Sequence, residues 1–395
     1  MFWDKEFETM PLEALKDFQL KQLQQTVAWV YERVPYYKNK LDDLGIKPQD
    51  IRVLADLARL PFSVKNDLRD NYPFGLCAVP MTEVVRIHAS SGTTGKPITG
   101  PYTAEDLEQW SDCMARNLYA VGVRSNDILQ NSYGMGLFTG GLGFHQGATK
   151  VGVAVIPTSS GQTERQITIM QDFGTTVLCC TPSYALTIAE KGYQMGVNFK
   201  NLRLRAGIFG AEPWTREMRK EIEERLDIKA YEAYGLTPEG TKGELVFTAI
   251  RRRAMPLLRY RTRDITMLKR GKCECGRTLI KMEKVYGRSD DMLIISGVNV
   301  FPSQIESLLL DQKGIEPQYV IIVRKKGYLD TLEVNVEARP EIYQAGAEKI
   351  KEVEQRIEAH MRGLIGIGIK IRLVSPGTIA RSEGKAKRVI DERKL

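Results

Sequence analysis

The residues with the clearest chemical content lie in one short loop, Ser90-Ser91-Gly92-Thr93-Thr94-Gly95-Lys96-Pro97. Its glycines let the backbone turn sharply and approach a ligand closely, and its hydroxyl and N–H groups offer many hydrogen-bond donors. The loop is not a Walker A motif, because Pro97 stands where that motif has serine or threonine. A surface turn of small polar residues is the alternative. The concentration of donors favours a loop that binds an oligophosphate.

The elements that must position this loop follow from an alternation that begins near residue 127. Short apolar runs of strand type alternate with helical patterns: the runs are 151–157, 175–180 and 206–209, and the helical patterns are 162–173, 184–195 and 214–226. This order predicts a parallel α/β sheet. Ligands collect at the carboxyl ends of such strands. The turns at 181–183, 210–213 and 234–237 are therefore expected to line a site.

The later part of the chain has a different pattern. Residues 243–248 and 256–261 are typical of strands in a separate, mostly antiparallel region. After residues 287–291 a small α+β unit follows, with strands at 292–295, 319–324, 332–338 and 369–374, a helix that begins at Pro302, a long helix over 347–364 and a Gly- and Lys-rich tail. We therefore predict an α/β protein of two domains, residues 1–288 and 289–395.

The bulk composition excludes several classes of protein. Of 395 residues, 43% are hydrophobic and 27% are charged, as in a soluble globular protein with a large core. No apolar run is long enough to span a bilayer and the N-terminus lacks a signal-peptide pattern, so we expect a cytoplasmic protein without a membrane partner. The net charge of +8 is densest at Arg251–Arg253 and near the C-terminus. Neither cluster has the aromatic platforms of a nucleic-acid binder.

The six cysteines fall into two groups. Four lie in apolar settings and are expected to be buried thiols: Cys77, Cys113, Cys179 and Cys180. Cys273 and Cys275 instead lie in a small polar knuckle, Gly-Lys-Cys-Glu-Cys-Gly-Arg, that could supply two ligands to a structural zinc ion. A reduced turn with two thiols is the alternative, because no further ligand pair is nearby. No disulfide framework is indicated.

Six motifs occur in the order found in the adenylate-forming enzymes, and the chain resembles that superfamily over nearly its whole length. They are residues 90–97, 210–213, 234–237, 260–264, 287–291 and 382–385. Three further stretches, 134–141, 178–184 and 291–306, are similar to the phenylacetate–CoA ligases in particular. The resemblance implies a large N-terminal adenylate-forming domain, with parallel sheets and an antiparallel subregion, and a small mobile C-terminal α+β domain with its hinge at residues 288–291.

The resemblance implies an ATP-dependent ligase that joins an aryl acid to coenzyme A. The expected reaction converts phenylacetate, ATP and CoA into phenylacetyl-CoA, AMP and diphosphate through an acyl-adenylate, with Mg²⁺, as in phenylacetate catabolism. Expected partners are a small aromatic carboxylic acid, ATP, CoA and a second copy of the chain. Two alternatives stay open: an adenylate-forming enzyme that transfers another acyl group to CoA, a carrier protein or an amine, and an inactive nucleotide sensor. The presence of Asp264 and Lys385 argues against the sensor.

The same resemblance assigns the nucleotide site. Residues expected to hold the β- and γ-phosphates are Ser90, Ser91, Gly92, Thr93, Thr94, Gly95 and Lys96. Gly210, Ala211, Glu212 and Pro213 would form the adenine wall, and Tyr234, with Gly235 and Thr237 beside it, would cover the other face. Asp264 would accept hydrogen bonds from the ribose hydroxyls, and Arg288 would reach the same nucleotide. For Asp264, an ion pair with Arg261 or Arg263 is the alternative.

The resemblance also assigns the catalytic residues and the acid pocket. Lys385 is the expected catalytic lysine, because a cation near the α-phosphate offsets repulsion between two anions; Lys387 is its rival. Asp290 would be the hinge residue about which the small domain rotates between the half-reactions. The acid pocket is expected to include Tyr133, Phe138, Gly141 and His145. For His145 a hydrogen-bonded packing role is the alternative.

One stretch departs from the family pattern. The family has a glutamate that ligates magnesium after Tyr-Gly-Leu-Thr, followed by a longer segment that often carries cysteine and histidine. Here Thr237 runs directly into Pro238-Glu239-Gly240. We favour omission of residues between Thr237 and Pro238 from this sequence over a true loss. Glu239 is then not assigned to magnesium, and further zinc ligands would lie in the omitted segment.

Overall fold

The computed structural model describes the chain except residues 1, 90–96, 138, 213, 234–242, 270, 272, 284, 286, 290, 292, 296–297, 327–328, 384–385 and 395. The chain divides into two compact units. Unit 1 comprises Met1–Ser159 and Gly235–Val285, and unit 2 comprises Ser160–Tyr234 and Tyr286–Leu395. The predicted domain boundary at residue 288 stays a prediction.

Unit 1 begins with helices that surround a buried apolar cluster. Its first helices are α1 (Lys5–Glu8), α2 (Leu12–Arg33), α3 (Pro35–Asp43) and α4 (Lys65–Asp70), with short 3₁₀ turns at Pro48–Asp50, Leu54–Arg59 and Met81–Glu83. Val27 and Val30 of α2 are fully buried and pack in one cluster with Tyr37 and Leu258. Pro35 begins α3 because its missing N–H and fixed φ suit the first helical position.

Two helices of unit 1 pack closely because one of them is rich in glycine. They are α5 (Ala104–Ala120) and α6 (Thr139–Val151). A Cβ added at Gly143 would lie 2.6 Å from the Trp110 ring, and one added at Gly147 would lie 2.4 Å from the Met114 side chain. Real Cβ atoms do not approach this closely, so these two glycines allow the helices to touch.

The strands of unit 1 pair with one another. β1 (Arg86–Ala89) pairs antiparallel with β2 (Thr99–Tyr102), β3 (Ile128–Asn131) pairs parallel with β4 (Ala154–Ile156), β8 (Gly243–Phe247) pairs antiparallel with β9 (Tyr260–Thr266), and β10 (Leu268–Lys269) pairs antiparallel with β11 (Lys281–Met282). Two predicted strands begin later than expected. Residues 151–153 complete α6 and its turn, since Gly152 has a φ of 86°, and 256–259 lie outside β9, since Arg259 has a φ of 43°.

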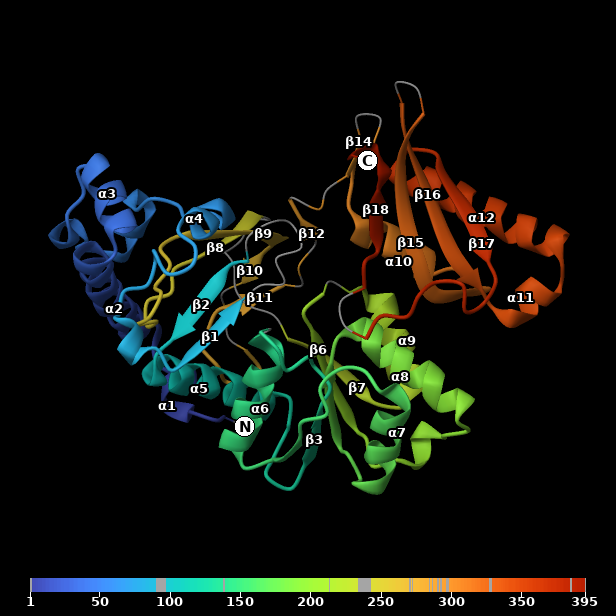
Figure 1. Cartoon of the computed structure of the whole chain (residues 1–395), viewed down its shortest axis with the longest axis horizontal. Helices are drawn as coiled ribbons and strands as arrows, with labels where there is room; N and C mark the ends of the chain where they lie inside the picture. Colours follow the sequence, from blue (N-terminus) through green and yellow to red (C-terminus); the bar gives the residue numbers. More distant parts are fainter. Residues whose placement is uncertain are drawn as a thin grey trace. The chain divides into compact units, whose positions relative to one another are not determined.

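The first part of unit 2 confirms the predicted parallel α/β pattern. β5 (Val177–Cys180), β6 (Ala206–Gly210) and β7 (Lys229–Ala233) run parallel in that order. The helices α7 (Thr163–Asp172), α8 (Pro182–Gln194) and α9 (Arg216–Leu226) lie beside them, with a 3₁₀ turn at Phe199–Asn201 (Figure 1). All four residues of β5 and all five of β6 are buried. Such strands read as continuous apolar runs because helices cover both faces of a parallel sheet.

The C-terminal part of unit 2 is the predicted α+β module. A hairpin, β13 (Leu293–Ile295) and β14 (Val298–Val300), precedes α10 (Pro302–Leu310) and follows β12 (Gly287–Arg288). The main sheet has the order β17-β16-β15-β18, with β15 (Ile315–Lys326), β16 (Leu329–Ala338), β17 (Ile369–Val374) and β18 (Val389–Asp391). The remaining helices are α11 (Pro340–Gln344), α12 (Ala347–Ile365) and a 3₁₀ turn at Glu392–Lys394. Val353, Ile357 and Met361 of α12 are buried in the cluster that covers this sheet.

None of the helices within the described residues combines the length and the apolar content needed to cross a membrane.

Candidate functional site

The turn after β6 lies where a parallel sheet presents ligands. Gly210 ends the strand, and a Cβ there would lie 2.6 Å from the Ala233 carbonyl oxygen of β7. Ala211 follows with a φ of 71°, which is unusual for a residue with a side chain. Such backbone occurs at functional sites, where the surrounding structure holds it in place. The turn therefore places the partly exposed Ala211 at the carboxyl end of β6, directly after the buried Gly210.

Glu212 connects this turn to two other segments. Its Oε1 accepts a hydrogen bond from the Ser183 N–H at 2.7 Å, and its Oε2 accepts one from the Ala386 N–H at 2.9 Å. Burial raises the pKa of Glu212 above its ordinary value, although both hydrogen bonds and Arg388 act in the opposite direction. Protein N–H groups therefore bind both oxygens of the Glu212 carboxylate.

The helix whose Ser183 N–H donates to Glu212 is α8, and it begins at the carboxyl end of β5. Thr181 caps α8 by accepting the Tyr184 N–H, and Pro182 takes the first helical position. The predicted turn at 181–183 is thus the first turn of a helix. A carboxylate at a helix N-terminus is favourable because it faces the unpaired N–H groups and the positive end of the helix dipole.

Asp264 lies in β9 with 7% of its surface exposed. Its neighbours Arg261 and Arg263 both contact Glu244 of β8: the Arg261 Nη2 lies 2.5 Å from Glu244 Oε2, and the Arg263 N–H donates to Oε1 at 3.0 Å. The Arg263 Nη1 also lies 4.0 Å from Glu244 Oε2, so both arginine side chains approach Glu244, and the ion pair considered for Asp264 stays a prediction.

Arg288, the predicted nucleotide contact in β12, lies in unit 2. Its Nε is 3.4 Å from Asp291 Oδ2, and both side chains are partly exposed. This ion pair lies beside the predicted hinge residue Asp290, which is outside the described residues.

Two residues predicted for the acid pocket, Tyr133 and Gly141, both form hydrogen bonds with Asn131 in unit 1. Tyr133 is 3% exposed and stacks on Phe144, with ring centroids 5.2 Å apart and planes inclined by 5°. The Gly141 carbonyl accepts a hydrogen bond from the Asn131 side chain at 2.7 Å, and a Cβ at Gly141 would lie 2.6 Å from the Gly134 carbonyl oxygen. Sequence reasoning missed Phe144 and Asn131. Phe144 lies three residues after Gly141, one helical turn away, and this spacing could have identified it.

His145 has a buried ring nitrogen without a partner. Within the described residues, its Nδ1 makes no hydrogen bond. A histidine that serves only packing is expected to have its buried nitrogens satisfied. The two roles considered for His145, orienting a carboxylate or packing, stay predictions.

Several predicted site residues lie outside the described part of the chain. They are Ser90, Ser91, Gly92, Thr93, Thr94, Gly95, Lys96, Phe138, Pro213, Tyr234, Gly235, Thr237, Asp290 and Lys385. The flanks of the first loop are described: Ala89 of β1 and Thr99 of β2 are directly paired. The flanks of Lys385 are described as well, because the Ala386 N–H contacts Glu212 and Arg381 contacts α8.

The Cys273 and Cys275 sulfur atoms lie 2.7 Å apart. Hydrogen bonding with the Cys273 thiol, assisted by Arg277, lowers the pKa of Cys275 to about 7. Two neighbouring thiols can supply two of the four ligands of a zinc ion. Among the described residues, however, no cluster of three or more His, Cys, Asp or Glu side chains could hold a metal.

The other cysteines match the prediction only in part. Cys179 and Cys180 are buried in β5, as expected, but Cys77 is partly exposed and Cys113 is exposed. For Cys113 the prediction was wrong because it lies on an amphipathic helix, α5, whose buried residues are Asp106, Ser111, Ala115 and Leu118. Apolar neighbours in sequence do not decide which face of such a helix a residue occupies.

Comparison with known proteins places the chain in a family. It is 43% identical to a phenylacetate–coenzyme A ligase of Thermus thermophilus, with all of both chains covered. The chain belongs to the phenylacetate–CoA ligase family of adenylate-forming enzymes. The family member of Escherichia coli is 42% identical, with 98% of this chain and 97% of that protein covered. Residues 297–393 also match the family described as AMP-binding enzyme C-terminal domain.

A solved structure of a related ligase gives two reference states. The 2-hydroxyisobutyryl-CoA ligase is 26% identical, and its postadenylation state with 2-HIB-AMP superimposes with a TM-score of 0.94, covering 100% of this chain and 93% of that one. The thioesterification state of the same ligase, with 2-HIB-AMP and CoA, gives a TM-score of 0.71 at the same coverage.

In the alignment with the Thermus family member, that protein has residues at positions where this chain has none. The alignment spans 445 positions, whereas this chain has 395 residues, so about 50 positions of the alignment have no residue in this chain. The predicted junction after Thr237 is one place for them.

Proposed function

We propose that this protein joins a carboxylic acid to coenzyme A at the expense of ATP, through an acyl-adenylate. The observation that carries the proposal is the contact between the segment bearing Lys385 and the turn after β6, made by the Ala386 N–H on Glu212 at 2.9 Å. This contact brings a basic segment to the sheet edge where α/β proteins bind ligands. Full-length similarity to phenylacetate–CoA ligases supports the same reaction.

The proposed reaction has two steps whose demands on the protein differ. First, a carboxylate oxygen of the acid attacks the α-phosphorus of ATP, the bond to the bridging oxygen breaks, and diphosphate leaves. Then the thiolate sulfur of coenzyme A attacks the acyl carbon, and the bond from that carbon to the AMP oxygen breaks. Two anions meet in the first step, so a cation near the α-phosphate lowers its barrier. We assign that cation to Lys385 and the ribose contact to Asp264.

The acid we propose is small and aromatic, with phenylacetate first. The stacked rings of Tyr133 and Phe144 offer an apolar wall, and Gly141 adds no side chain beside it. The unpartnered Nδ1 of His145 offers a polar group for the carboxylate. A flat apolar wall with one polar group is typical of sites for small organic ligands.

Acid-dependent release of AMP tests the proposal. The protein is assayed with ATP and a panel of aryl and short-chain acids, each with and without coenzyme A. We expect phenylacetate to stimulate AMP release most, and CoA to be required for turnover. If no acid stimulates AMP release, the ligase function is wrong. Release that depends on a carrier protein or amine in place of CoA would favour the alternative acceptor.

We propose two metals in supporting roles. Mg²⁺ would accompany ATP, so EDTA should abolish AMP release and added Mg²⁺ should restore it. Cys273 and Cys275 would supply two of the ligands of a structural zinc ion, since their sulfur atoms converge at 2.7 Å. Metal analysis of the purified protein and of a Cys273→Ser/Cys275→Ser variant tests this. Zinc content that does not change in the variant would contradict it.

We also propose a cytoplasmic homodimer. Light scattering on the purified protein and fractionation of cells that express it test these two points. A single-chain mass in solution would contradict the dimer.

A further inference from the structure

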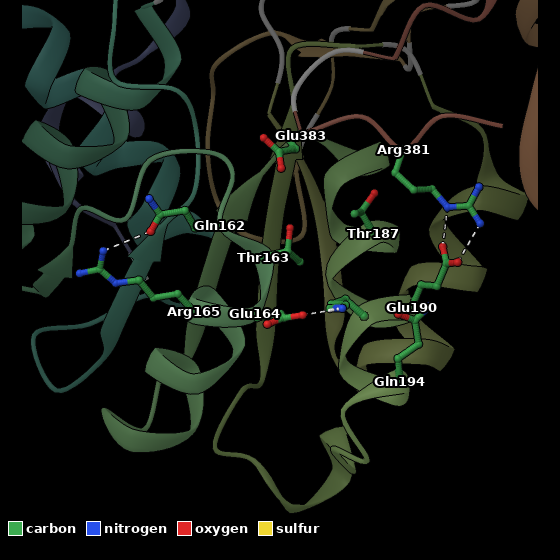
Figure 2. Close-up of a pocket in the computed structure, with 10 residues that line it drawn as sticks. Gln162, Thr163, Glu164, Arg165, Thr187, Glu190, Gln194, Arg381 and Glu383 are labelled. Atoms are coloured by element: carbon green, nitrogen blue, oxygen red, sulfur yellow. Dashed lines mark hydrogen bonds and ion pairs between the residues drawn. The ribbon is translucent and has the colours of Figure 1, made fainter. Parts of the chain in front are cut away.

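On the N-terminal side of Lys385, the guanidinium of Arg381 binds two carboxylates. Arg381 donates to both carboxylate oxygens of Glu190 in α8, from Nε and Nη2 at 2.7 Å each (Figure 2). It also donates to both oxygens of Glu337 in β16, from Nη1 at 2.7 Å and from Nη2 at 2.9 Å. Paired donors of this kind are among the strongest hydrogen-bonded contacts in proteins.

The two carboxylates have different positions in unit 2. Glu337 belongs to the C-terminal module, has no exposed side-chain surface and also accepts the Ile379 N–H at 2.7 Å. Glu190 belongs to α8 and has 30% of its side chain exposed. Arg381 and Glu337 therefore form an anchor inside the module, whereas Arg381 and Glu190 form a link from the module to α8.

A second link lies on the other side of Lys385. The Ala386 N–H donates to Glu212 at 2.9 Å, and the Arg388 guanidinium donates to the Ser183 hydroxyl at 3.2 Å. The segment thus contacts the 160–234 part of unit 2 four residues before Lys385 and again one residue after it. The described residues on both sides of Lys385 are therefore in contact with the 160–234 part of unit 2.

A cavity of about 570 Å³ lies beside the segment that carries Lys385. Glu383 and Arg381 line it together with residues of α7 and α8 (Figure 2). A Cβ at Gly161 would lie 2.8 Å from the Glu383 carboxylate, so the Glu383 side chain passes close to the Gly161 backbone.

We propose that Glu190 and Arg381 are positioning residues for acyl-adenylate formation alone. This proposal rests on the proposed function. The Arg381–Glu190 link sets the segment so that Lys385 reaches the α-phosphate, and the link is absent when thioester formation takes place. The paired donors hold the segment while the link is formed. Because 30% of the Glu190 side chain is exposed, water can solvate its carboxylate when the link opens. The related ligase, which has separate solved states for the two steps, gives a precedent for opening.

Separate assays of the two half-reactions test the proposal on the Glu190→Gln variant. Adenylate formation is followed by diphosphate exchange into ATP with phenylacetate, and thioester formation is followed from supplied phenylacetyl-adenylate and CoA. We expect Glu190→Gln to slow adenylate formation about tenfold and to leave thioester formation within about twofold of the wild type. Arg381→Lys, which cannot bind both carboxylates in pairs, should show the same split.

Glu164→Gln is the matched control. Glu164 lines the same cavity and pairs with Lys191 at 2.6 Å, which is a contact within the 160–234 part of unit 2 (Figure 2). We expect both of its half-reactions to match the wild type. Equal slowing of both half-reactions in Glu190→Gln, or no change in either, would overturn the proposal. A wild type that carries out neither half-reaction would instead overturn the proposed function.

Discussion

Glu212 and Ala386 lie 174 positions apart in the chain, yet the Ala386 N–H donates to Glu212 Oε2 at 2.9 Å. The other oxygen of the same carboxylate accepts the Ser183 N–H at 2.7 Å. One side chain therefore joins a turn of the sheet, the first turn of α8 and the segment that carries Lys385. The consequences of this arrangement can be measured.

Glu212→Gln should slow adenylate formation about tenfold. A carboxylate accepts two N–H groups, whereas an amide accepts with its oxygen only and turns its NH₂ toward the second donor. One of the two contacts, to Ser183 or to Ala386, must therefore be lost. Diphosphate exchange measures the effect. An unchanged exchange rate would show that Glu212 does not hold the segment during this step.

The same substitution should change how stability depends on pH. Burial raises the pKa of Glu212, so the folded state binds a proton more tightly than the unfolded state does. Stability therefore falls as pH rises from the ordinary carboxyl range through the raised pKa. Glu212→Gln removes this titration, and urea unfolding at several pH values should show a flatter profile. If stability fell more steeply with pH in the variant than in the wild type, the raised pKa of Glu212 would be contradicted.

Arg381→Met should destabilise the fold by about 3 kcal/mol, because it leaves the buried carboxylate of Glu337 without its cation. Burial acts to raise the pKa of Glu337, but hydrogen bonds from Arg381 and from backbone N–H groups outweigh it and lower the pKa. The stability from this pair is present above the ordinary carboxyl pKa and is lost as pH falls through the lowered one. Urea unfolding near neutral and acid pH measures both effects. If Arg381→Met lowered the free energy of unfolding equally at both pH values, Arg381 would not be the cation that lowers the pKa of Glu337.

His145→Leu should separate a ligand-binding histidine from a structural one. Nδ1 of His145 has no hydrogen-bond partner among the described residues, so an apolar replacement of similar size breaks no bond to it. We expect a melting temperature within about 2 °C of the wild type and a loss of about tenfold in kcat/KM for phenylacetate. A large fall in melting temperature with unchanged kcat/KM would assign His145 to packing.

Gly147→Ala should destabilise unit 1 by about 1–3 kcal/mol, since its Cβ would lie 2.4 Å from Met114 on the facing helix. Gly136→Ala is the control, because nothing lies within 4 Å of the Cβ it would add. Thermal unfolding of both variants measures the difference. Similar melting temperatures for the two variants would show that α5 and α6 can separate at small cost.

Cys275 should react with iodoacetamide faster than the buried cysteines at about neutral pH. Its pKa of about 7 leaves a substantial thiolate fraction, whereas burial raises the pKa of Cys179 and of Cys180. Mass spectrometry of partly alkylated protein, treated first with a chelator, identifies the modified residues. Slow alkylation of Cys275 would contradict the lowered pKa.

Local patterns in the sequence predicted much of the fold. The apolar runs at 175–180 and 206–209 became β5 and β6, and the helix expected over 347–364 became α12, because burial on both faces and helical periodicity are each visible in a short window. The strand expected at 256–261 begins only at Tyr260, since Arg259 adopts a left-handed backbone that no local pattern announces.

Contacts between distant residues were not predictable in this way. The motif at 210–213 indicated a nucleotide wall, but nothing in it shows that the Glu212 carboxylate receives Ala386. Arg381 and Glu190 are 191 positions apart, and charged side chains are too common for a sequence to reveal which two will pair. Such contacts depend on how the chain folds back on itself, and only coordinates supply that.

The contacts along α8 have a geometric consequence. Three side chains along one stripe of α8 contact the tail: Ser183 contacts Arg388, Thr187 contacts the Ser382 carbonyl, and Glu190 contacts Arg381. The tail therefore runs along the helix in the opposite direction to the helix's own chain. Each residue of a helix advances by about 100° around its axis. A single residue inserted between Ser183 and Glu190 would swing half of this stripe away from the tail while the sheet beneath stayed intact. The rotation of α8 about its own axis therefore determines where Arg381, Ser382 and Arg388 contact it.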